Sequence, residues 1–180
     1  MGAGKTLSIV AGVFSLLGVF ILNWVNSTTS MVYGLGGLMG LGDFFENIDT
    51  LAFLYGMIFG DSFQDWMMYL IAVEVILLGI SPILQFVGAK SKAAAIIGSL
   101  LPLAVGVIIL LISMETFSTE ISAKLSLLFA YPYITTEAMV EDIIPFTYGF
   151  EGRDEAVGLY ALLAGGFLGL VSGFMSRDDF

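Results

Sequence analysis

The feature that most constrains this chain is a set of four long apolar segments, each about the length of a membrane-spanning helix. A helix needs about 20 mostly apolar residues to cross a bilayer, because the hydrocarbon core is about 30 Å thick and each residue rises about 1.5 Å. The four segments cover residues 6–25, 67–87, 93–113 and 156–175. Backbone polar groups in lipid must be paired within their own segment, so each segment is predicted to be a helix.

The composition supports a membrane protein and excludes several classes of function. Of the 180 residues, 58% are hydrophobic and 12% are charged, whereas a soluble domain is about 45–50% apolar and about a quarter charged. The chain has no Cys and no His, which excludes disulfides, thiolate nucleophiles and the commonest general base and metal ligand. We therefore expect an integral membrane protein that is not an enzyme, with no catalytic residue, metal or cofactor.

The charged residues lie mostly outside the apolar segments, and their distribution predicts an orientation. The short link 88–92 carries two Lys, one Lys precedes the first segment and one Arg follows the fourth. By the positive-inside rule, these parts and both termini are cytoplasmic in the cell membrane. The long segments 26–66 and 114–155 then lie outside, where thirteen acidic residues face only two basic ones. The predicted fold is all-α: a bundle of four transmembrane helices with an acidic extracytoplasmic cap formed by these two outer segments.

The outer segments contain further apolar residues that need a partner. Two runs in the first, 31–41 and 51–60, are too short to cross the membrane as helices. They fit strands of a small outer sheet, short interfacial helices or a packed cap, of which we favour a folded cap. In the second outer segment, helical spacing predicts a helix that continues the third span or lies on the membrane, with Phe117, Ile121, Leu125, Leu128 and Phe129 on its apolar face. Another short helix is predicted over 136–144, where Pro145 ends it.

Three polar or aromatic positions mark the predicted membrane boundary. Trp24 and Trp66 are predicted to be interfacial anchors, because amphipathic aromatic rings favour the headgroup region. Asn26 begins the glycosylation sequon Asn26-Ser27-Thr28, which fits a polar helix end equally well.

A stripe of small residues in the fourth segment is the most specific pattern in the chain. It consists of Ala161, Gly165, Gly169 and Gly173, each four residues from the next, with Gly158 on a nearby position. Such a small-xxx-small stripe allows helix backbones to approach closely in lipid. The stripe predicts either tight packing within one four-helix bundle or a contact face for another subunit. The sequence does not distinguish these two alternatives.

Glu74 is the single charged residue inside a predicted span. A charged side chain at the bilayer centre costs on the order of 2.5–3.5 kcal/mol, so such a residue usually faces the bundle interior or a water-filled cavity. Its expected partner is a hydroxyl such as that of Ser99, a backbone carbonyl freed by Pro82 or Pro102, or a bound cation or proton. The alternatives are a neutral acid hydrogen-bonded inside the bundle and a residue that serves transport. Gln85, nearer the inner end, is expected at the membrane interface.

The acidic residues of the outer segments suggest cation binding, because carboxylates are suitable ligands for Ca²⁺. The two densest groups comprise Asp43, Glu46 and Asp49 in the first outer segment, and Glu151, Asp154 and Glu155 in the second. Neither group has the spacing of a defined calcium loop. A solvated, mutually repelling surface is therefore the main expectation.

The N-terminal residues Gly2-Ala3-Gly4-Lys5-Thr6 look like the end of a phosphate-binding loop. That loop needs another Gly five residues before Gly4, a position that falls before Met1, and must follow a strand. We therefore interpret Lys5 as an inner-side charge anchor, and expect neither a nucleotide nor a nucleic acid as a partner.

The layout resembles that of tetraspan proteins of the claudin family, with both termini inside, a long first outer segment and a short inner link. The resemblance covers the whole chain in topology. Claudins carry a Trp, then Gly-Leu-Trp and two Cys in the first outer segment. Here Trp24 lies at the membrane edge, Gly34-Leu35 is followed by Gly36, and Cys is absent. The resemblance implies a four-helix fold with an outer sheet, and carries over no functional residue.

The sequence is most consistent with a structural or assembly protein in the lipid bilayer. Such a protein would associate laterally with itself as a homo-oligomer, or join a larger membrane complex as a subunit. The alternative is a small cation or proton channel or carrier subunit that uses Glu74. A membrane enzyme would have to work with carboxylates, Ser or Lys, and no pair has a suitable spacing.

Overall fold

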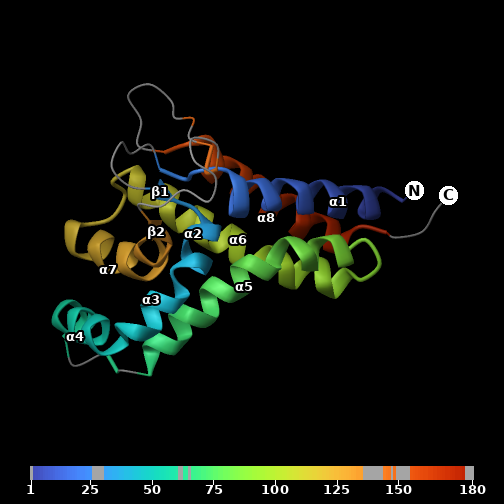
Figure 1. Ribbon diagram of the computed structural model, residues 1–180. Helices are drawn as coiled ribbons and strands as arrows, with labels where there is room; N and C mark the ends of the chain where they lie inside the picture. Colours follow the sequence, from blue (N-terminus) through green and yellow to red (C-terminus); the bar gives the residue numbers. More distant parts are fainter. Residues whose placement is uncertain are drawn as a thin grey trace.

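Four helices of membrane length form the body of the protein (Figure 1). The computed structural model describes residues 2–25, 31–60, 63–64, 66–135, 144–146, 148 and 155–176. The first span combines α1 (Ala3–Leu16) with a π-helical turn, η1 (Leu17–Ile21), and the others are α5 (Met67–Val87), α6 (Lys92–Ser113) and α8 (Val157–Phe174). The prediction of a mostly helical chain with four apolar helices of membrane length is confirmed.

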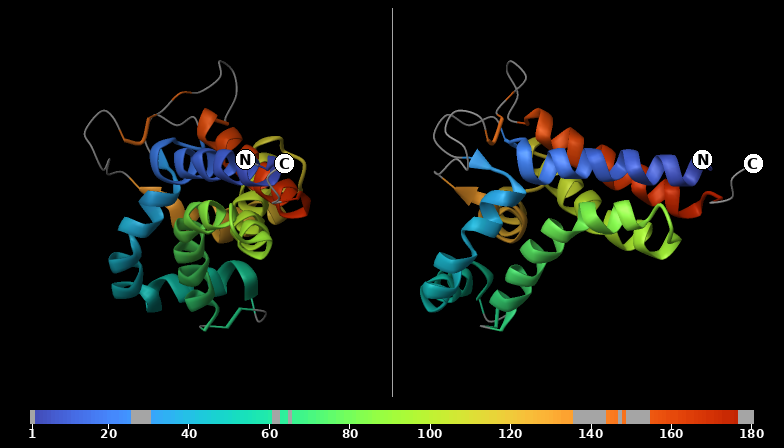
Figure 2. Two further views of the ribbon diagram at one scale, coloured as in Figure 1. Left: turned by 90° about the vertical axis from the view of Figure 1, so that its right-hand side faces the viewer. Right: turned by 45° about the vertical axis from the view of Figure 1, so that its right-hand side comes forward.

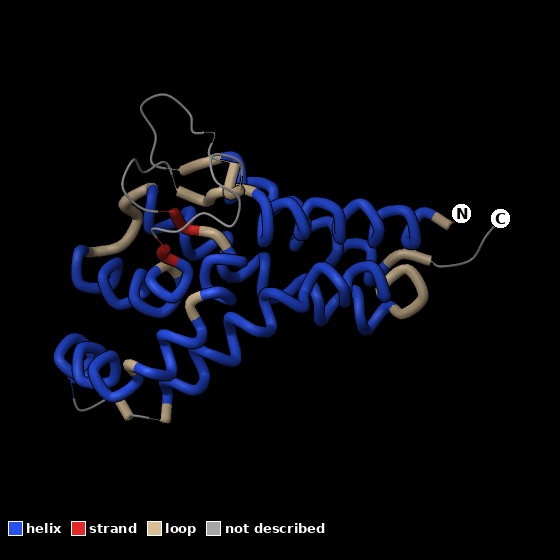
Figure 3. The backbone as a smooth tube through the Cα atoms, in the orientation of Figure 1, coloured by secondary structure: helices blue, strands red, loops and turns tan. Residues whose placement is uncertain are grey.

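α8 is the central helix of the bundle. It packs along both α1 and α6, and α5 packs against α6 and α1 from the other side (Figures 1 and 3). The first and last described residues lie at the same end, where the Gly4 amide donates to the Ser176 carbonyl at 3.2 Å. This end is called the terminal end, and the opposite one, which carries the segments between the spans, the distal end.

The segment between α1 and α5 is mainly helical. After the short strand β1 (Met31–Val32) come α2 (Gly34–Met39), α3 (Leu41–Glu46) and α4 (Ile48–Phe59). The two apolar runs, 31–41 and 51–60, are therefore chiefly short helices. Among the described residues, the sheet that the claudin layout implied is limited to two short strands, β1 and a strand from the segment between α6 and α8. Packing explains the difference: α2 lies against α5 and η1, where a helix pairs its own backbone and needs no neighbouring strand.

The segment between α6 and α8 folds back onto the first one. It contains α7 (Thr119–Phe129), a single 3-10 turn η3 (Tyr131–Tyr133) and strand β2 (Ile134–Thr135). α7 is separated from α6 by a turn in which Glu115 has a φ of 51°. β2 pairs antiparallel with β1, with Met31 opposite Thr135, so a two-residue ladder joins both segments. Most of the helix predicted over 136–144 lies outside the described residues, as do Asn26 and its sequon.

α4 differs in direction from the membrane-length helices. It is seen nearly end-on in Figure 1, where α1 and α8 run across the view, and it lies across the distal end beside the start of α5 (Figures 1 and 2). With 12 residues it is apolar but too short to span a bilayer. Its Tyr55 is buried, whereas Phe53 and Met57 are 67% and 62% exposed. α4 therefore presents an uncovered apolar face at the distal end.

Candidate functional site

The Glu74 side chain of α5 is hydrogen-bonded to a tyrosine from the segment between α6 and α8. The Tyr133 hydroxyl donates a hydrogen bond to Oε1 of Glu74 at 3.0 Å. Tyr133 is fully buried in η3, and Glu74 is half-buried on α5. Burial, the neighbouring Glu74 carboxylate and the hydrogen bond to it raise the pKa of Tyr133 well above its usual range. The pair joins the segment between α6 and α8 to a membrane-length helix.

The Ser99 hydroxyl, one of the predicted partners of Glu74, bonds elsewhere. The Ser99 hydroxyl donates to the Ala95 carbonyl of its own helix, at 2.5 Å, in the half of the bundle nearer the termini. The position of Tyr133 gave no sequence signal, because no spacing rule links a residue after α7 to one inside α5. The only local hint was the Tyr131-Pro132-Tyr133 turn, which follows an amphipathic helix and places two tyrosines close together in sequence.

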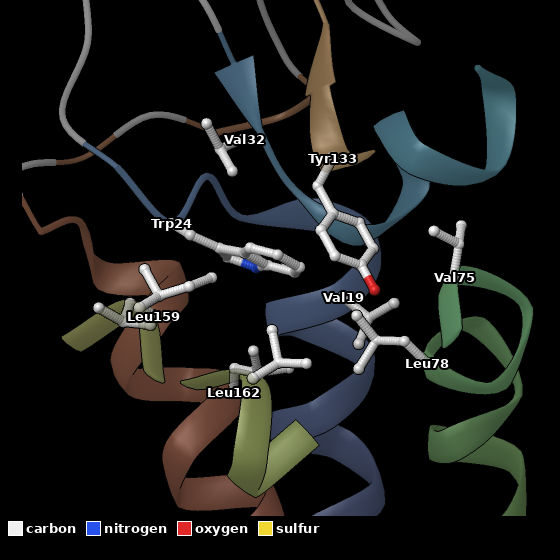
Figure 4. Packing of buried hydrophobic residues seen from close by; sticks show 10 residues of the cluster. Val19, Trp24, Val32, Val75, Leu78, Tyr133, Leu159 and Leu162 are labelled. Atoms are coloured by element: carbon white, nitrogen blue, oxygen red, sulfur yellow. The ribbon is translucent and has the colours of Figure 1, made fainter. Parts of the chain in front are cut away.

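Trp24 supports Tyr133 from the other side, and its predicted role as an interfacial anchor is wrong. Trp24 is fully buried, its Nε1 donates to the Gly18 carbonyl at 2.5 Å, and its ring lies 4.9 Å from that of Tyr133 (Figure 4). The chain beyond η1 is extended and turns back over the bundle, which carries the indole into the core. Trp66, in contrast, is 56% exposed at the start of α5.

Asn23 fixes this turn, although no local sequence pattern marks it out. Its Oδ1 accepts from the amides of Trp24 and Val32, at 3.1 and 2.6 Å, and its Nδ2 donates to the Val25 carbonyl at 2.7 Å. Asn23 is almost fully buried. A buried side-chain amide bonded in this way orders two chain segments at once, because each unmade bond would leave a polar group without water.

A second aromatic cluster ties α4 to the rest of the distal end. Tyr55 stacks on Phe59 and packs beside Phe63, and its hydroxyl donates to the Leu127 carbonyl of α7 at 2.5 Å. Burial is the main cause that raises the pKa of Tyr55, and the neighbouring Tyr131 and Glu74 add to it. Tyr55 thus connects α4 to α7, as Tyr133 connects η3 to α5.

The half of the bundle nearer the termini contains a separate polar cluster. Gln85, expected at the membrane interface, lies two residues before the end of α5 and is fully buried within the bundle. Its Nε2 donates to the Gly98 carbonyl at 3.0 Å and lies 3.4 Å from the Ser99 hydroxyl, while Ser8 donates to the Gln85 carbonyl at 2.6 Å. These contacts link α5 with α6 and α1. Such interhelical hydrogen bonds stabilise bundles in lipid by about 1 kcal/mol each.

The small-residue stripe of α8 lies at close contacts inside the chain. A Cβ at Gly158 would meet the Leu22 carbonyl oxygen at 2.7 Å, and one at Gly165 would meet the Ser15 amide at 2.6 Å. A Cβ at Gly169 would collide with the Ser99 hydroxyl, and one at Gly173 with Ile96 of α6. Ala161 is buried in the same contact region. The stripe therefore brings α8 against its own chain's α1 and α6.

The acidic residues are not gathered into one site. Asp43, Glu46 and Asp49 are exposed on α3 and α4, while Glu155 is buried and accepts a hydrogen bond from the Tyr160 hydroxyl at 3.1 Å. Within the described part of the chain, no three acidic side chains lie close enough together to hold a metal ion. Glu151 and Asp154 lie outside the described residues.

An apolar layer separates the two polar regions of the bundle. Toward the distal end lies the Glu74–Tyr133 pair, and toward the termini lies the Gln85 cluster. The buried side chains between them are mainly hydrophobic and come from all four membrane-length helices: Val19, Leu78, Val105 and Leu162. Figure 4 shows Val19, Leu78 and Leu162. The buried hydroxyls of Ser15 and Ser81 lie in the same stretch of the bundle. Comparison of the chain with protein families, curated proteins and solved structures finds no match.

Proposed function

We propose that the protein is a structural or assembly component of the membrane, which associates laterally with copies of itself or with larger membrane proteins. The observation that carries this proposal is the apolar layer across the bundle. Moving an ion through a region lined by Val19, Leu78 and Leu162 would strip it of water without offering a polar partner, which costs many kcal/mol. A single chain of this kind is better suited to holding structure than to conducting.

The surface available for association is the exposed face of α4. The glycine stripe of α8 is covered by α1 and α6, so it supports packing within the chain. On α4, Ala52 and Gly56 are four residues apart, and a Cβ added at Gly56 would meet no atom within 4 Å. These two small residues lie in a hollow of about 510 Å³ bordered by Phe53, Met57 and Phe63. A helix of a neighbouring chain could approach α4 closely at this point.

The proposal is tested by the size of the particle in mild detergent. Gly56→Leu would fill the hollow without disturbing the chain's own packing, so oligomer mass should fall while the thermal unfolding midpoint stays unchanged. Gly42→Leu is the matched control, because Gly42 also has open space within 4 Å but lies on α3. A wild-type protein that is monomeric in both detergent and nanodiscs would contradict self-association. If the Gly56→Leu variant keeps the wild-type oligomer mass, the contact between chains does not lie on α4.

A second candidate, a cation or proton channel or carrier subunit, is favoured by one observation. Glu74 is half-buried beside a phenol, which provides a carboxyl and a hydroxyl at one place within the membrane-length helices. Flux measurements in reconstituted vesicles separate the two functions. We expect no cation or proton flux under a gradient. Flux that Glu74→Gln abolishes while the fold is retained would instead establish the transport function.

A further inference from the structure

A second and larger cavity lies at the distal end, where the first outer segment meets α5. Its volume is about 660 Å³, within the range of about 300–1,000 Å³ typical of small-molecule sites. Its walls come from α2, α3 and α4 on one side and from Tyr131 to Thr135 on the other, and α5 closes it below. It is distinct from the hollow on α4 described above, because it uses Leu51 and Leu54 of that helix rather than Phe53 and Met57.

The bottom of this cavity reaches into the membrane-length part of the protein. It is formed by Ala72 and Val75, which lie within α5 and are otherwise nearly fully buried. Two of the apolar side chains around the cavity, Met39 and Leu54, are exposed on the outer surface. A ligand bound here would bury only one of its ends against apolar side chains, and its other end would stay near water. This is the environment that suits an amphiphile, whereas a fully polar solute would gain nothing from the apolar part.

One wall of the cavity is polar and carries an unbalanced negative charge. Asp43, Asn47 and Thr50 line it at spacings of four and three residues, on one side of α3 and α4. The Asn47 side chain donates to the Asp43 backbone carbonyl at 2.9 Å, which leaves the Asp43 carboxylate uninvolved in that bond. Within the described chain, no basic side chain lies within ion-pair distance of Asp43. The wall therefore favours a cationic group over an anionic one.

We propose that this cavity binds a membrane amphiphile with a protonated amine head, whose head lies beside Asp43 and whose alkyl chain lies over Ala72 and Val75. The ligand enters from the leaflet that borders the distal end. The negative charge of the polar wall selects a cationic head group, because an ammonium group can donate to the carboxylate and to the neighbouring hydroxyl and amide oxygens. The apolar bottom of the cavity selects an alkyl chain for the other end of the ligand. This inference does not depend on the proposed assembly function, because it uses a different face of α4.

The test uses three ligands with the same chain and different heads: dodecylamine, dodecanol and dodecanoate. Binding of each radiolabelled ligand to the full chain in nanodiscs is measured by equilibrium dialysis, with empty nanodiscs as the correction for partitioning. We expect saturable binding of one dodecylamine per chain, about tenfold or more tighter than binding of dodecanoate, since hydrogen bonds to charged groups contribute about 1.5–3 kcal/mol. Asp43→Asn should remove the preference for the amine while leaving dodecanol binding unchanged.

A pair of glycine variants locates the site. Gly40 lines the cavity, has a φ of −76° that any residue adopts, and has room for a Cβ, whose nearest neighbour would be the Gly36 carbonyl oxygen at 3.4 Å. Gly40→Phe should therefore fill the cavity and reduce dodecylamine binding about tenfold or more. Gly42→Phe is the control, because Gly42 also has open space but does not line the cavity. Should Gly40→Phe fail to fold, the head preference of Asp43→Asn decides alone.

Several results would overturn the proposal. Equal affinity for the three ligands would show that the polar wall does not discriminate between their head groups. Equal effects of Gly40→Phe and Gly42→Phe on binding would place the ligand outside this cavity. Butylamine binding as tightly as dodecylamine would assign the site to a soluble amine. If Gly40→Phe lowers the oligomer mass and the wild-type protein binds none of the three ligands, the cavity is filled by a neighbouring chain.

Discussion

The Tyr133 hydroxyl and the Glu74 carboxylate are 59 residues apart in sequence and are joined by a hydrogen bond of 3.0 Å. The bond connects a buried turn in the segment between α6 and α8 to Glu74, the one charged residue of α5. It gives Glu74 a partner without a cation, and it gives a buried phenol an acceptor. The pair thus holds the distal segments and the bundle in one arrangement.

Removing the Tyr133 hydroxyl should destabilise the protein. Tyr133→Phe keeps the ring that packs on Trp24 but leaves the half-buried Glu74 without this donor. We expect a loss of about 1–3 kcal/mol in the free energy of unfolding. The measurement is reversible unfolding in detergent followed by Trp fluorescence. Tyr69→Phe is the control, since Tyr69 lies exposed on α5, and should change nothing.

A double-mutant cycle isolates the pair. Glu74→Leu removes the acceptor oxygens of this hydrogen bond, as Tyr133→Phe removes its donor. The combined variant should cost less than the sum of the two single changes, by about 0.5–3 kcal/mol, because the residues are in direct contact. Additive effects would mean that the hydrogen bond contributes no stability of its own.

Alkaline pH should unfold the distal end, and the sign follows from the direction of two pKa shifts. The pKa values of Tyr133 and Tyr55 are raised in the folded chain, whereas a tyrosine in the unfolded chain titrates near pH 10. Below that pH both states hold the protons, and the stability is fully present. Above it the unfolded state releases protons first, so stability falls as pH rises toward the folded pKa values.

The measurement is the thermal unfolding midpoint between about pH 8 and pH 11.5, with tyrosinate absorbance recorded in parallel. The midpoint should begin to fall above about pH 10, and Tyr133→Phe should make that fall shallower. An equally steep fall in the variant would assign the alkaline sensitivity to other groups, among them Tyr55.

Replacing Gly165 and Gly169 together by Leu should separate α8 from its neighbours. The new side chains would collide with Ser15 of α1 and Ser99 of α6. Overpacking of this kind costs about 1–3 kcal/mol at each site, or more where backbone is in the way. The thermal unfolding midpoint and the particle mass should be measured together. Unchanged stability with a smaller particle would instead assign the stripe to contact with a second subunit.

The membrane-length helices could be predicted well because length and hydropathy alone determine them. α5 occupies the predicted range 67–87, and α6 begins one residue earlier than expected, at Lys92. The first span was less accurate, since helix was expected to Val25 but ends at Ile21. The reason is tertiary: residues from Asn23 onward bond to β1, which draws the chain out of the helix. A hydropathy window cannot detect such a competitor.

The candidate site was only half accessible from sequence. Glu74 was found because a charge in an apolar segment is conspicuous, but Tyr133 was not. Its contact with Glu74 arises from the fold-back of one outer segment over the other, which no local pattern encodes. The same fold-back explains why Trp24 is buried. Its ring was expected at the lipid surface, because it lies near the end of a span, and is instead fully buried. Long-range packing overrides local rules at both residues.

The central place of α8 has a consequence for how the bundle is made. A chain is synthesised from its N-terminus, so α1 enters the membrane well before α8, the helix against which Gly18 and Ser15 pack, has left the ribosome. Until then the inward faces of α1 and α6 can only be covered by lipid or by membrane chaperones. The bundle therefore closes after translation of its last membrane-length helix, through contacts between segments far apart in sequence. Damage to α8 should leave three inserted helices exposed to the quality-control machinery of the cell.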